Sequence, residues 1–379
     1  MKFLHLSDLH IGKTVGGFSM IEEQKHILDR ILDIADREDP DGVLIAGDVY
    51  DRSIPSVEAV ELFDDFISEL ADRSLQVFII PGNHDSSGRL AFASGIMSRS
   101  GIYIAGSYDG ECRRVDVTGR DGVKVKVHML PFIRPAHVRN ALKEEHIEDY
   151  TAAVKAAVDR MELNCGEINL LLAHQFVTGA STSGSEELSV GGLENVDASI
   201  LDEFDYVALG HIHRAQNIGE KIRYCGTPLK YSFSEAGDSK SVTIVDIGGK
   251  GDITVRTEEL KPLRDMLEIK GSYDELTLKS FYDGEEFRDA YLHIILTDEN
   301  EIPDAMARLR VIYRNVMKLS YERLAGSNAP EVPEVESAEE FSPGAIFDGF
   351  YESVYGRPMS EWQAEHMKQM IEKIWEDEL

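Results

Sequence analysis

Short runs of apolar residues, each followed by polar ones, recur along the first 260 residues of the chain. Five runs have the length and the Val, Ile, Leu and Phe content of buried strands. They are Lys2–Ser7, Gly42–Ala46, Gln76–Ile80, Ile168–Ala173 and Tyr206–Leu209. Apolar residues at helical spacing lie between them, most clearly in Ile21–Arg37 and Val57–Leu70. Alternating strands and helices of this kind predict an α/β layered domain.

A second, smaller pattern begins near Leu260. Strands are predicted at Met266–Gly271, Ala290–Thr297 and Asn315–Arg323, and helices at Tyr273–Phe281 and Ile302–Tyr313. A unit of about 60 residues is near the lower limit for folding alone. We therefore expect this α+β unit to pack against the first domain.

The last part of the chain has a linker followed by apolar helices. Pro, Glu, Ser and Ala dominate Gly326–Pro343, a composition typical of a flexible linker. Two helices are then predicted, Ala345–Tyr355 and Met359–Glu376, separated by Gly356-Arg357-Pro358. The final helix carries an apolar stripe of Trp362, Met367, Met370, Ile371, Ile374 and Trp375. Periodicity alone leaves two roles open, packing on its own domain or docking on a partner.

The formal charge is the most unusual feature of the composition. The chain has 39 Lys and Arg residues against 69 Asp and Glu residues, which gives a net charge of −30. Such a chain repels nucleic acid at long range, so charge alone argues against a DNA partner. The excess is uneven, because 13 acidic and three basic residues lie between Glu331 and Leu379.

The rest of the composition favours a cytoplasmic enzyme. No apolar run approaches the ~18 residues of a membrane span, and Met1-Lys2 leads directly into a strand without a secretory leader. The cysteines, Cys112, Cys165 and Cys225, are far apart and form no C-x-x-C pair. Neither a disulfide framework nor a zinc ribbon is expected from them.

Each predicted strand of the first domain ends in residues able to bind a metal ion. The five ends are Ser7-Asp8-Leu9-His10, Gly47-Asp48-Val49-Tyr50-Asp51, Gly82-Asn83-His84-Asp85, Ala173-His174 and Gly210-His211-Ile212-His213. Side chains two residues apart on an extended segment point the same way, so pairs within these motifs can converge. Ligand sites of α/β domains assemble at the carboxyl ends of strands. Carboxylate, amide and imidazole ligands together suit Mn, Fe or Zn.

Each motif taken alone has an ordinary structural explanation. Asp8-x-His10 also fits polar residues at a strand end, and Asp48 also fits a helix cap or turn. Gly82-Asn83-His84-Asp85 fits a tight turn with left-handed backbone, and His174 fits a buried, hydrogen-bonded histidine. The conjunction of five such motifs, all at strand ends, favours a metal site.

The order D-x-H, G-D-x-x-D, G-N-H-D, H and G-H-x-H resembles that of the calcineurin-like metallophosphoesterase superfamily, from Met1 to about Glu258. The resemblance implies an α/β (α+β) fold in which a two-layer β-sandwich is flanked by helices and holds two divalent metal ions. It assigns the metal ligands as Asp8, His10, Asp48 and His213 on one ion and Asp48, Asn83, His174 and His211 on the other. His84 would contact the scissile phosphate, held by Asp51.

Three further segments are similar to the SbcD family, the nuclease subunits of bacterial SbcCD complexes. They are Ala173–Ala180 continuing to Gly192, Tyr224–Glu235, and Gly356–Ser360. This resemblance implies a Mn²⁺-dependent DNA nuclease, a 3′→5′ exonuclease on duplex ends and an endonuclease on single strands and hairpins. It also implies a homodimer that works with SbcC, an ATPase that gates access of duplex DNA, in DNA repair, recombination and replication.

The resemblance also divides the chain. It implies a nuclease domain at 1–260, an α+β capping domain that binds DNA at 261–325, a linker at 326–343 and helices at 344–379 that dock on the coiled-coil base of SbcC. Val57–Leu70 and the helix after Asn83 are the expected dimer surface. Basic residues that could help to bind DNA are Arg52, Arg89, Arg134 and Lys230, and the loops Ser86–Leu90 and Ser181–Glu187 could line its path.

Two other functions remain open at this point. A stand-alone phosphodiesterase acting on a small molecule or phosphoprotein would share the metal site, but it would not need the capping unit or the apolar tail. A non-catalytic scaffold with a decayed site is the second, and the complete set of metal-binding residues argues against it.

Overall fold

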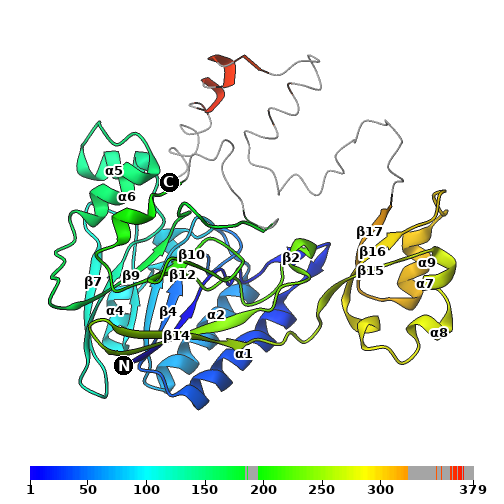
Figure 1. Cartoon of the computed structure of the whole chain (residues 1–379), viewed down its shortest axis with the longest axis horizontal. Coiled ribbons are helices and arrows are strands. Elements are labelled where there is room, and N and C mark those ends of the chain that lie inside the picture. Colours follow the sequence, from blue (N-terminus) through cyan, green and yellow to red (C-terminus); the bar gives the residue numbers. More distant parts are fainter. Residues whose placement is uncertain are drawn as a thin grey trace. The chain divides into compact units, whose positions relative to one another are not determined.

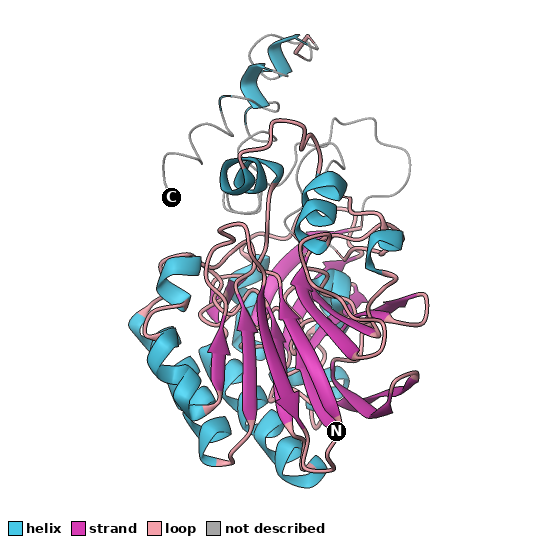
Figure 2. Cartoon of the chain, turned by 90° about the vertical axis from the view of Figure 1, so that its left-hand side faces the viewer, coloured by secondary structure: helices cyan, strands magenta, loops and turns pink. Residues whose placement is uncertain are grey.

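The computed structural model describes residues 1–183, 186, 195–322, 347, 351, 359–360, 362–364, 366–368 and 370. Residues up to 322 form three main sheets with helices around them, shown from two directions in Figures 1 and 2.

The first six-stranded sheet has the order β14-β13-β1-β4-β5-β6. Its strands are β1 (Lys2–Leu6), β4 (Gly42–Ala46), β5 (Gln76–Ile80), β6 (Ile102–Ile104), β13 (Ser241–Gly249) and β14 (Asp252–Glu259). Strands β1, β4, β5 and β6 run parallel, and β13 pairs antiparallel with β1. The carboxyl ends of β1, β4 and β5 therefore lie at one edge of the sheet.

The second six-stranded sheet has the order β11-β12-β10-β9-β8-β7. Its strands are β7 (Arg113–Thr118), β8 (Lys124–Met129), β9 (Ile168–His174), β10 (Tyr206–Gly210), β11 (Gln216–Ile218) and β12 (Ile222–Tyr224). The four inner strands run parallel, and each edge strand is antiparallel to its neighbour. Strands β7 and β8 are consecutive and form a hairpin.

The two sheets pack face to face, which confirms the predicted two-layer sandwich. Inward-facing residues of both sheets, among them Phe3, Phe78, Leu170 and Tyr206, form one buried cluster between the layers. Alternate residues of the same strands face outward, since successive side chains of a strand point to opposite faces. Helices cover these outer faces, so the central strands β4, β9 and β10 are buried on both sides.

Two pairs of helices form the outer layers. Helices α1 (Ile21–Glu38) and α2 (Val57–Asp72) cover the first sheet, and α5 (Pro135–Leu142) and α6 (Tyr150–Val158) cover the second. The Ser56 hydroxyl caps α2 by accepting a hydrogen bond from the Ala59 amide. Shorter elements lie in the connections: β2 (Thr14–Val15), β3 (Phe18–Ser19), α3 (Ser87–Leu90), α4 (Ser94–Met97), η1 (Ser98–Ser100), η2 (Ala198–Leu201) and η3 (Phe233–Glu235).

The small α+β unit contains a three-stranded parallel sheet, β15 (Met266–Gly271), β16 (Tyr291–Leu296) and β17 (Val316–Tyr321). Its other elements are α7 (Tyr273–Leu276), α8 (Lys279–Tyr282), η4 (Glu286–Asp289) and α9 (Ala305–Ile312). The prediction of one helix at Tyr273–Phe281 was wrong. Leu278 has extended backbone, with φ −65° and ψ 129°, and divides the segment into α7 and α8.

This unit packs against the sandwich domain through the first turn of α1. The Glu23 carboxylate is fully buried and accepts hydrogen bonds from the Arg264 amide (3.1 Å) and from Arg264 Nη1 (2.8 Å). The Tyr291 hydroxyl lies 3.4 Å from the same carboxylate. Beside this contact, a Cβ on Gly16 would lie 2.7 Å from Met317 Cβ, so the β2–β3 turn meets β17 closely.

The predicted linker Gly326–Pro343 lies outside the described residues, as do most residues of the helices predicted at Ala345–Tyr355 and Met359–Glu376. The described residues Trp362–Ala364, His366–Lys368 and Met370 are helical. The hydroxyl of Ser360 accepts from the Gln363 amide at 3.4 Å, and Gln363 Oε1 accepts from the Ser360 amide at 3.0 Å. This reciprocal pair is a capping box at the start of a helix. Within the described part of the chain, no helix has the length and apolarity to cross a membrane.

Buried His5 makes stability depend on pH. Its Nε2 lies 3.2 Å from the Leu209 carbonyl, which only accepts, so Nε2 carries the proton and the Tyr206 hydroxyl donates to Nδ1 at 2.9 Å. Burial, assisted by Arg223, lowers the pKa of His5 from 6.5 to about 3. Between these two values the unfolded chain binds more protons, so stability is present above pH 6.5 and falls as the pH drops.

We expect His5→Gln to reduce this pH dependence. One pKa unit corresponds to about 1.4 kcal/mol, so the wild type should lose about 2 kcal/mol more than the variant between about pH 6 and about pH 4.5. Urea unfolding of both proteins at the two pH values measures the difference. Parallel losses of stability would contradict the assignment.

Candidate metal centre

The five motifs lie where the two sheets of the sandwich meet. β1, β4 and β5 of the first sheet and β9 and β10 of the second all end at this junction, and His174 Nδ1 lies 2.7 Å from the Ala46 carbonyl of the opposite sheet. Because a carbonyl only accepts, Nδ1 of His174 is the protonated nitrogen and Nε2 faces the site.

The loops after β1 and β4 are joined by main-chain hydrogen bonds. The amides of Asp8 and His10 donate to the carbonyls of Gly47 and Asp48, both at 3.0 Å. The ladder continues with Ile11 donating to Val49 at 2.9 Å. These bonds fix the two loops relative to each other before any side chain is considered.

Motif glycines permit the close approach of the loops. A Cβ on Gly82 would lie 2.1 Å from Asp48 Oδ1, and one on Gly210 would lie 1.9 Å from the Ala46 carbonyl oxygen. Both distances are far below van der Waals contact, so only glycine fits before Asn83 and before His211.

Four of the predicted ligands have left-handed backbone. Their φ angles are 52° for Asp8, 43° for His10, 49° for Asp48 and 96° for His211. Such conformations cost on the order of 1–3 kcal/mol each and persist where surrounding structure enforces them. Here the enforcing structure is the main-chain ladder and the packed glycines.

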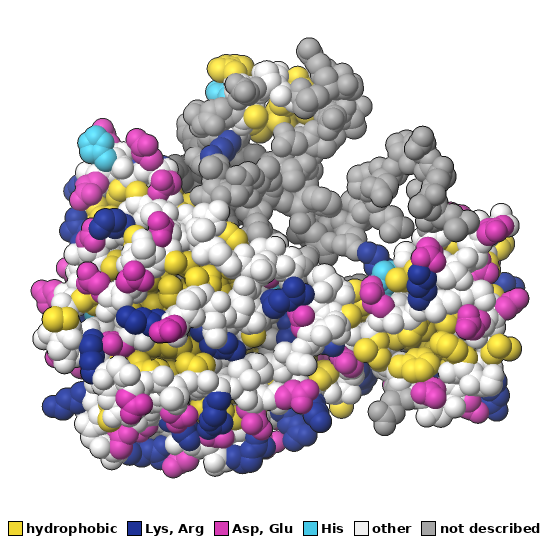
Figure 3. Space-filling view, viewed as in Figure 1, with side chains coloured by type: hydrophobic (Ala, Val, Ile, Leu, Met, Phe, Trp, Pro, Cys, Tyr) yellow, Lys and Arg dark blue, Asp and Glu magenta, His cyan; other side chains and the backbone are white. Residues whose placement is uncertain are grey.

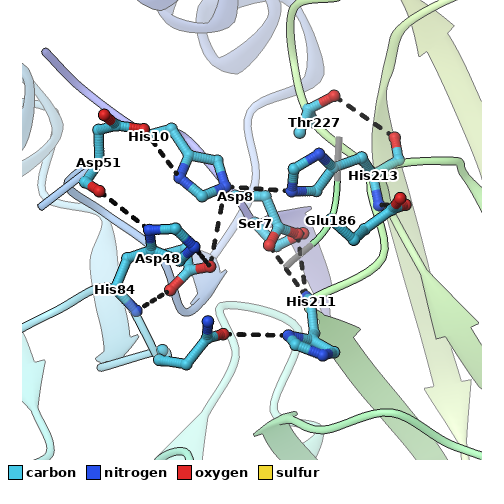
Figure 4. A network of polar contacts seen from close by, with 12 residues as sticks. Ser7, Asp8, His10, Asp48, Asp51, His84, Glu186, His211, His213 and Thr227 are labelled. Carbon is cyan, nitrogen blue, oxygen red and sulfur yellow. Dashed lines mark hydrogen bonds and ion pairs between the residues drawn. The ribbon is translucent and has the colours of Figure 1, made fainter. Parts of the chain in front are cut away.

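The ligand side chains converge on one small volume, drawn in Figure 4. His10 Nε2 lies 3.1 Å from His213 Nε2 and 3.7 Å from Asp48 Oδ2, while His174 Nε2 lies 3.3 Å from Asp48 Oδ2. Three groups each have their candidate ligand atoms within 4.8 Å of one another: Asp8, His10 and His213; His10, Asp48 and His84; Asp8, Asp48 and His174. Asp48 belongs to two of these groups.

Asn83 joins His211, the remaining predicted ligand, to the cluster through His174. Its Oδ1 lies 3.0 Å from His174 Nε2 and 3.0 Å from His211 Nδ1. All seven predicted metal ligands are therefore brought together at this junction, from five separate segments of the chain.

The cluster is buried, and the pKa values of its side chains are strongly shifted. Burial raises the pKa of Asp8 to about 7 and lowers the pKa of His211 to about 3. Burial also holds the pKa of His10 and of His213 well below the ordinary value, with Lys13 contributing to both. Burial would raise the pKa of Asp48, but His174 and His84 hold it well below its usual range.

These residues fit a divalent metal centre. Two carboxylates, one amide oxygen and four imidazoles, nearly all excluded from water, form a donor set suited to Mn, Fe or Zn. Buried carboxylates need a compensating positive charge, and His10, His211 and His213, held neutral by burial, keep a lone pair for a metal. The fourth imidazole differs, because Asp48 overcomes the effect of burial and raises the pKa of His174 to about 9, so this ring has to release a proton before it can bind a metal. Cations at this position would supply that charge.

The two predicted catalytic residues lie at the rim of the cluster. His84 Nδ1 lies 2.9 Å from the main-chain carbonyl of Asp51, so this nitrogen donates and Nε2 points toward Asp48 Oδ2, 4.0 Å away. Asp51 thus holds His84 through its main chain. Its carboxylate instead contacts Lys13 Nζ at 2.7 Å and faces His10 Nδ1 at 3.7 Å.

Sequence reasoning gave no role to Asp85, yet its carboxylate joins two of the loops. Oδ2 accepts from the amides of Val49 (3.1 Å) and Gly82 (2.9 Å), and Oδ1 accepts from that of Tyr50 (2.9 Å). Burial, with the nearby Asp48 charge, raises the pKa of Asp85 to about 6. Its place directly after Asn83-His84 was the only sequence signal.

A buried ion pair, also missed, supports the loop that carries His213. Lys240 Nζ donates to the His213 carbonyl at 3.0 Å, to Thr227 Oγ1 at 2.8 Å and to Glu235 Oε2 at 2.5 Å. Glu186 Oε1 accepts from the His213 amide at 2.9 Å. Lys240 is distant from every motif in sequence, so no local pattern identifies it.

Gln24, next to Glu23 on α1, holds the loop that follows β1. Its Nε2 donates to the His10 carbonyl at 2.7 Å, and its Oε1 accepts from the Gly12 amide at 2.9 Å. Helix α1 therefore fixes the first ligand loop as well as the small α+β unit.

The basic residues predicted to help with DNA make internal contacts. Arg89 Nη1 donates to the Ser53 carbonyl at 2.8 Å, and Lys230 pairs with Asp265 at 2.8 Å. Arg52 lies 3.8 Å from Asp51, and Arg134 lies over the Phe132 ring. Of the loop Ser181–Glu187, only 181–183 and 186 are described, while Ser86–Leu90 includes α3.

Comparisons with known proteins agree with this geometry. The family model described as calcineurin-like phosphoesterase matches residues 1–215, and one described as type 5 capsule protein repressor C-terminal domain matches residues 262–355. The SbcD subunit of the nuclease SbcCD from Staphylococcus epidermidis is 31% identical over 383 residues, and the match covers 100% of this chain and 100% of that protein.

Two solved structures are among the matches. TT1561 of Thermus thermophilus has a TM-score of 0.38 and 12% identity, covering 69% of this chain and 99% of its own. A dimetal phosphatase from Danio rerio has a TM-score of 0.40 and 11% identity, and the match covers 69% of this chain and 96% of the phosphatase.

The sandwich, its clustered ligands and the family model over residues 1–215 define a calcineurin-like metallophosphoesterase, an enzyme that hydrolyses phosphate esters with divalent metal ions. Within this class, the chain belongs to the SbcD family, as its full-length identity to the staphylococcal SbcD protein shows.

Asp48 is the residue whose loss should most affect metal binding, because it contacts ligands on both sides of the cluster. We expect Asp48→Ala to weaken binding of Mn²⁺ by at least about 100-fold, measured by calorimetric titration. Asp116→Ala, which removes an exposed carboxylate on β7, is the matched control and should bind like the wild type. Unchanged affinity and stoichiometry in Asp48→Ala would contradict the site.

Proposed function

We propose that this chain is the nuclease subunit of an SbcCD-type complex and hydrolyses phosphodiester bonds of DNA with two Mn²⁺ ions. The observation that carries the proposal is the seven-ligand cluster in a chain that matches the SbcD subunit of a nuclease over its full length. The small α+β unit, which a minimal phosphoesterase would not need, also has its counterpart in that relative.

The proposed ligands of the first ion are Asp8, His10, Asp48 and His213, and those of the second are Asp48, Asn83, His174 and His211. Asp48 would be shared by the two ions in this assignment. Its Oδ2 is 3.7 Å from His10 Nε2 on one side and 3.3 Å from His174 Nε2 on the other, which supports that role.

Bound divalent ions would neutralise the phosphate, lower the pKa of a water bound to them and stabilise the attacking and leaving oxygens. His84 supplies the proton in our proposal. Since its Nδ1 donates to the Asp51 carbonyl, Nε2 is the nitrogen that can carry a second proton toward the leaving oxygen. The Asp51 carbonyl also stabilises the charged imidazolium that this role requires.

We propose 3′→5′ exonuclease activity on duplex ends and endonuclease activity on single strands and hairpins, with SbcC and ATP controlling access of duplex DNA. On the face in Figure 3, Lys and Arg side chains alternate with Asp and Glu instead of forming a continuous basic surface. With a net charge of −30, the chain would bind duplex DNA weakly on its own. A partner that supplies positive surface would account for this charge.

The proposed domains are the nuclease domain 1–260, the capping domain 261–325, the linker 326–343 and the helices 344–379. We propose that the last helices dock on SbcC. Trp362 is 73% exposed and Met370 is 43% exposed within a capped helix, a pattern typical of a helix that binds an apolar groove.

We propose a cytoplasmic location, because the chain has three distant cysteines and none forms a disulfide.

We also propose a homodimer, with α2 and the α3–α4 segment at its surface. These elements and the segment before α2 include exposed large apolar residues: Ile54, Val57, Val60, Phe92 and Ile96. The Arg89 guanidinium joins the two segments by its hydrogen bond to the Ser53 carbonyl. Exposed apolar side chains that lie together are typical of protein interfaces, and this surface is our proposal for one.

Cleavage of DNA tests the proposed function. With Mn²⁺, the purified chain should cut a circular single strand and a closed hairpin, whereas Asp48→Ala should not. His84→Gln should keep its metals but lose about 10²-fold in rate, because the proton donor is removed. His146→Gln, an exposed histidine away from the site, is the control.

The same experiment also tests the alternative function, a stand-alone phosphodiesterase. A chain that binds two Mn²⁺ ions and hydrolyses a small diester, but cuts neither DNA, would be a stand-alone phosphodiesterase. Failure to bind Mn²⁺, with hydrolysis of neither substrate, would indicate a scaffold with a decayed site.

The dimer surface has its own test. The double variant Val57→Asp/Phe92→Asp should convert the dimer to a monomer in size-exclusion chromatography with light scattering, since it buries charges in the proposed interface. Val311→Asp changes an apolar residue of α9 that is 81% exposed and should leave the mass unchanged. A dimer that survives the double variant would place the interface elsewhere.

A further inference from the structure

A lysine lies beside the metal centre that none of the five motifs includes. Lys13 follows the first ligand loop, and its amide donates to the His10 carbonyl at 3.0 Å in a tight turn. Its Nζ donates to Asp51 Oδ1 at 2.7 Å and lies 5.8 Å from the centre of the Tyr231 ring. The ammonium is thus held in one place by a carboxylate and an aromatic face.

Asp51 places this charge next to the reacting groups. The Oδ1 atom that accepts from Lys13 is 3.7 Å from His10 Nδ1, and the Asp51 carbonyl accepts from His84 Nδ1 at 2.9 Å. One residue therefore contacts a metal ligand, the proposed proton donor and the ammonium. In Figure 4 the carboxylate and carbonyl of Asp51 lie beside His10 and His84, respectively.

Lys13 remains accessible to a substrate. Its side chain is 19% exposed, whereas His10 is completely buried. An ammonium has three N–H donors, and the hydrogen bond to Asp51 Oδ1 takes one of them. The others can bind phosphate oxygens, for which an ammonium is a common partner in proteins.

We propose that Lys13 Nζ binds the DNA phosphate next to the scissile one and so positions a nucleic-acid strand, in preference to a small diester, in the metal centre. A DNA strand carries one phosphate per ~3.4 Å of duplex axis, so a flanking phosphate lies near any phosphate bound at the cluster. Asp51 keeps the lysine extended toward that position. This inference rests on the proposed nuclease function.

A purely structural role for Lys13 makes a different prediction. If Lys13 only held Asp51 against His10, its loss would disturb the metal centre and slow every phosphodiester alike. If it binds a flanking phosphate, its loss affects only substrates that have one. Comparing a substrate that has a flanking phosphate with one that lacks it therefore distinguishes the two roles.

The experiment compares the wild type with Lys13→Met, which keeps the apolar stem, and Lys13→Arg, which keeps the charge. Lys25→Met, at an exposed lysine on α1, is the matched control. Two Mn²⁺-dependent rates are measured, for bis(p-nitrophenyl) phosphate, which has no flanking phosphate, and for a single-stranded oligonucleotide at several salt concentrations. Manganese stoichiometry is measured for each protein.

For Lys13→Met we expect kcat/KM on the oligonucleotide to fall about 10-fold, mainly through KM, as expected for one lost charge-assisted hydrogen bond. The slope of log(kcat/KM) against log[salt] should become shallower by about 0.7, the value for one phosphate contact to a single strand. Hydrolysis of the small diester should fall much less than hydrolysis of the oligonucleotide, manganese stoichiometry should be unchanged, and Lys13→Arg should recover most of the loss.

Equal losses on both substrates, or an unchanged salt slope, would overturn the inference and leave Lys13 with a structural role. Oligonucleotide cleavage equal to that of the wild type would overturn it as well. Failure of the proposed function looks different, because then the wild type itself would hydrolyse the small diester and leave the oligonucleotide intact.

Discussion

The structure depends on bringing two carboxylates, an amide and four imidazoles together in a space closed to water. Burial opposes this gathering, since it raises the pKa of Asp8 to about 7 and lowers that of His211 to about 3. The backbone opposes it too, with left-handed conformations at four of the ligands. Main-chain hydrogen bonds between loops, motif glycines and the Asp85 carboxylate together offset these costs. The sandwich provides a stiff frame on which such loops can be held.

Much of the fold and of the metal centre is predictable from sequence because the relevant signals are local. The strands Gly42–Ala46 and Gln76–Ile80 have the bounds that their apolar runs predict, and each is followed directly by its ligand motif. The division at Leu278 escaped prediction because the apolar spacing of Tyr273–Phe281 continues across a residue with extended backbone. The roles of Asp85, Lys240 and Lys13 escaped for another reason. Each acts through contacts with segments far away in sequence, which only the folded chain brings near.

The net charge of this protein does not describe the distribution of charge around the metal centre. The total of −30 predicts repulsion of DNA, yet the metal centre has a paired ammonium at its rim and a ligand set suited to dications. Long-range repulsion and short-range attraction act at different distances, since salt screens charges beyond about 10 Å. A protein of this kind can hold a phosphate at one point while having little general affinity for a polyanion.

Two consecutive residues of α1 serve two different parts of the molecule. Gln24 holds the loop that carries His10, and Glu23 receives Arg264 and Tyr291 from the small α+β unit. Removing that unit would take these donors away from the Glu23 carboxylate, one residue away from the support of a metal ligand. The sandwich domain therefore depends on the small α+β unit and cannot be combined freely with other domains. Any domain that replaced the small unit, in evolution or by design, would have to supply hydrogen-bond donors to Glu23. This requirement limits which domains can be joined to the sandwich after residue 260.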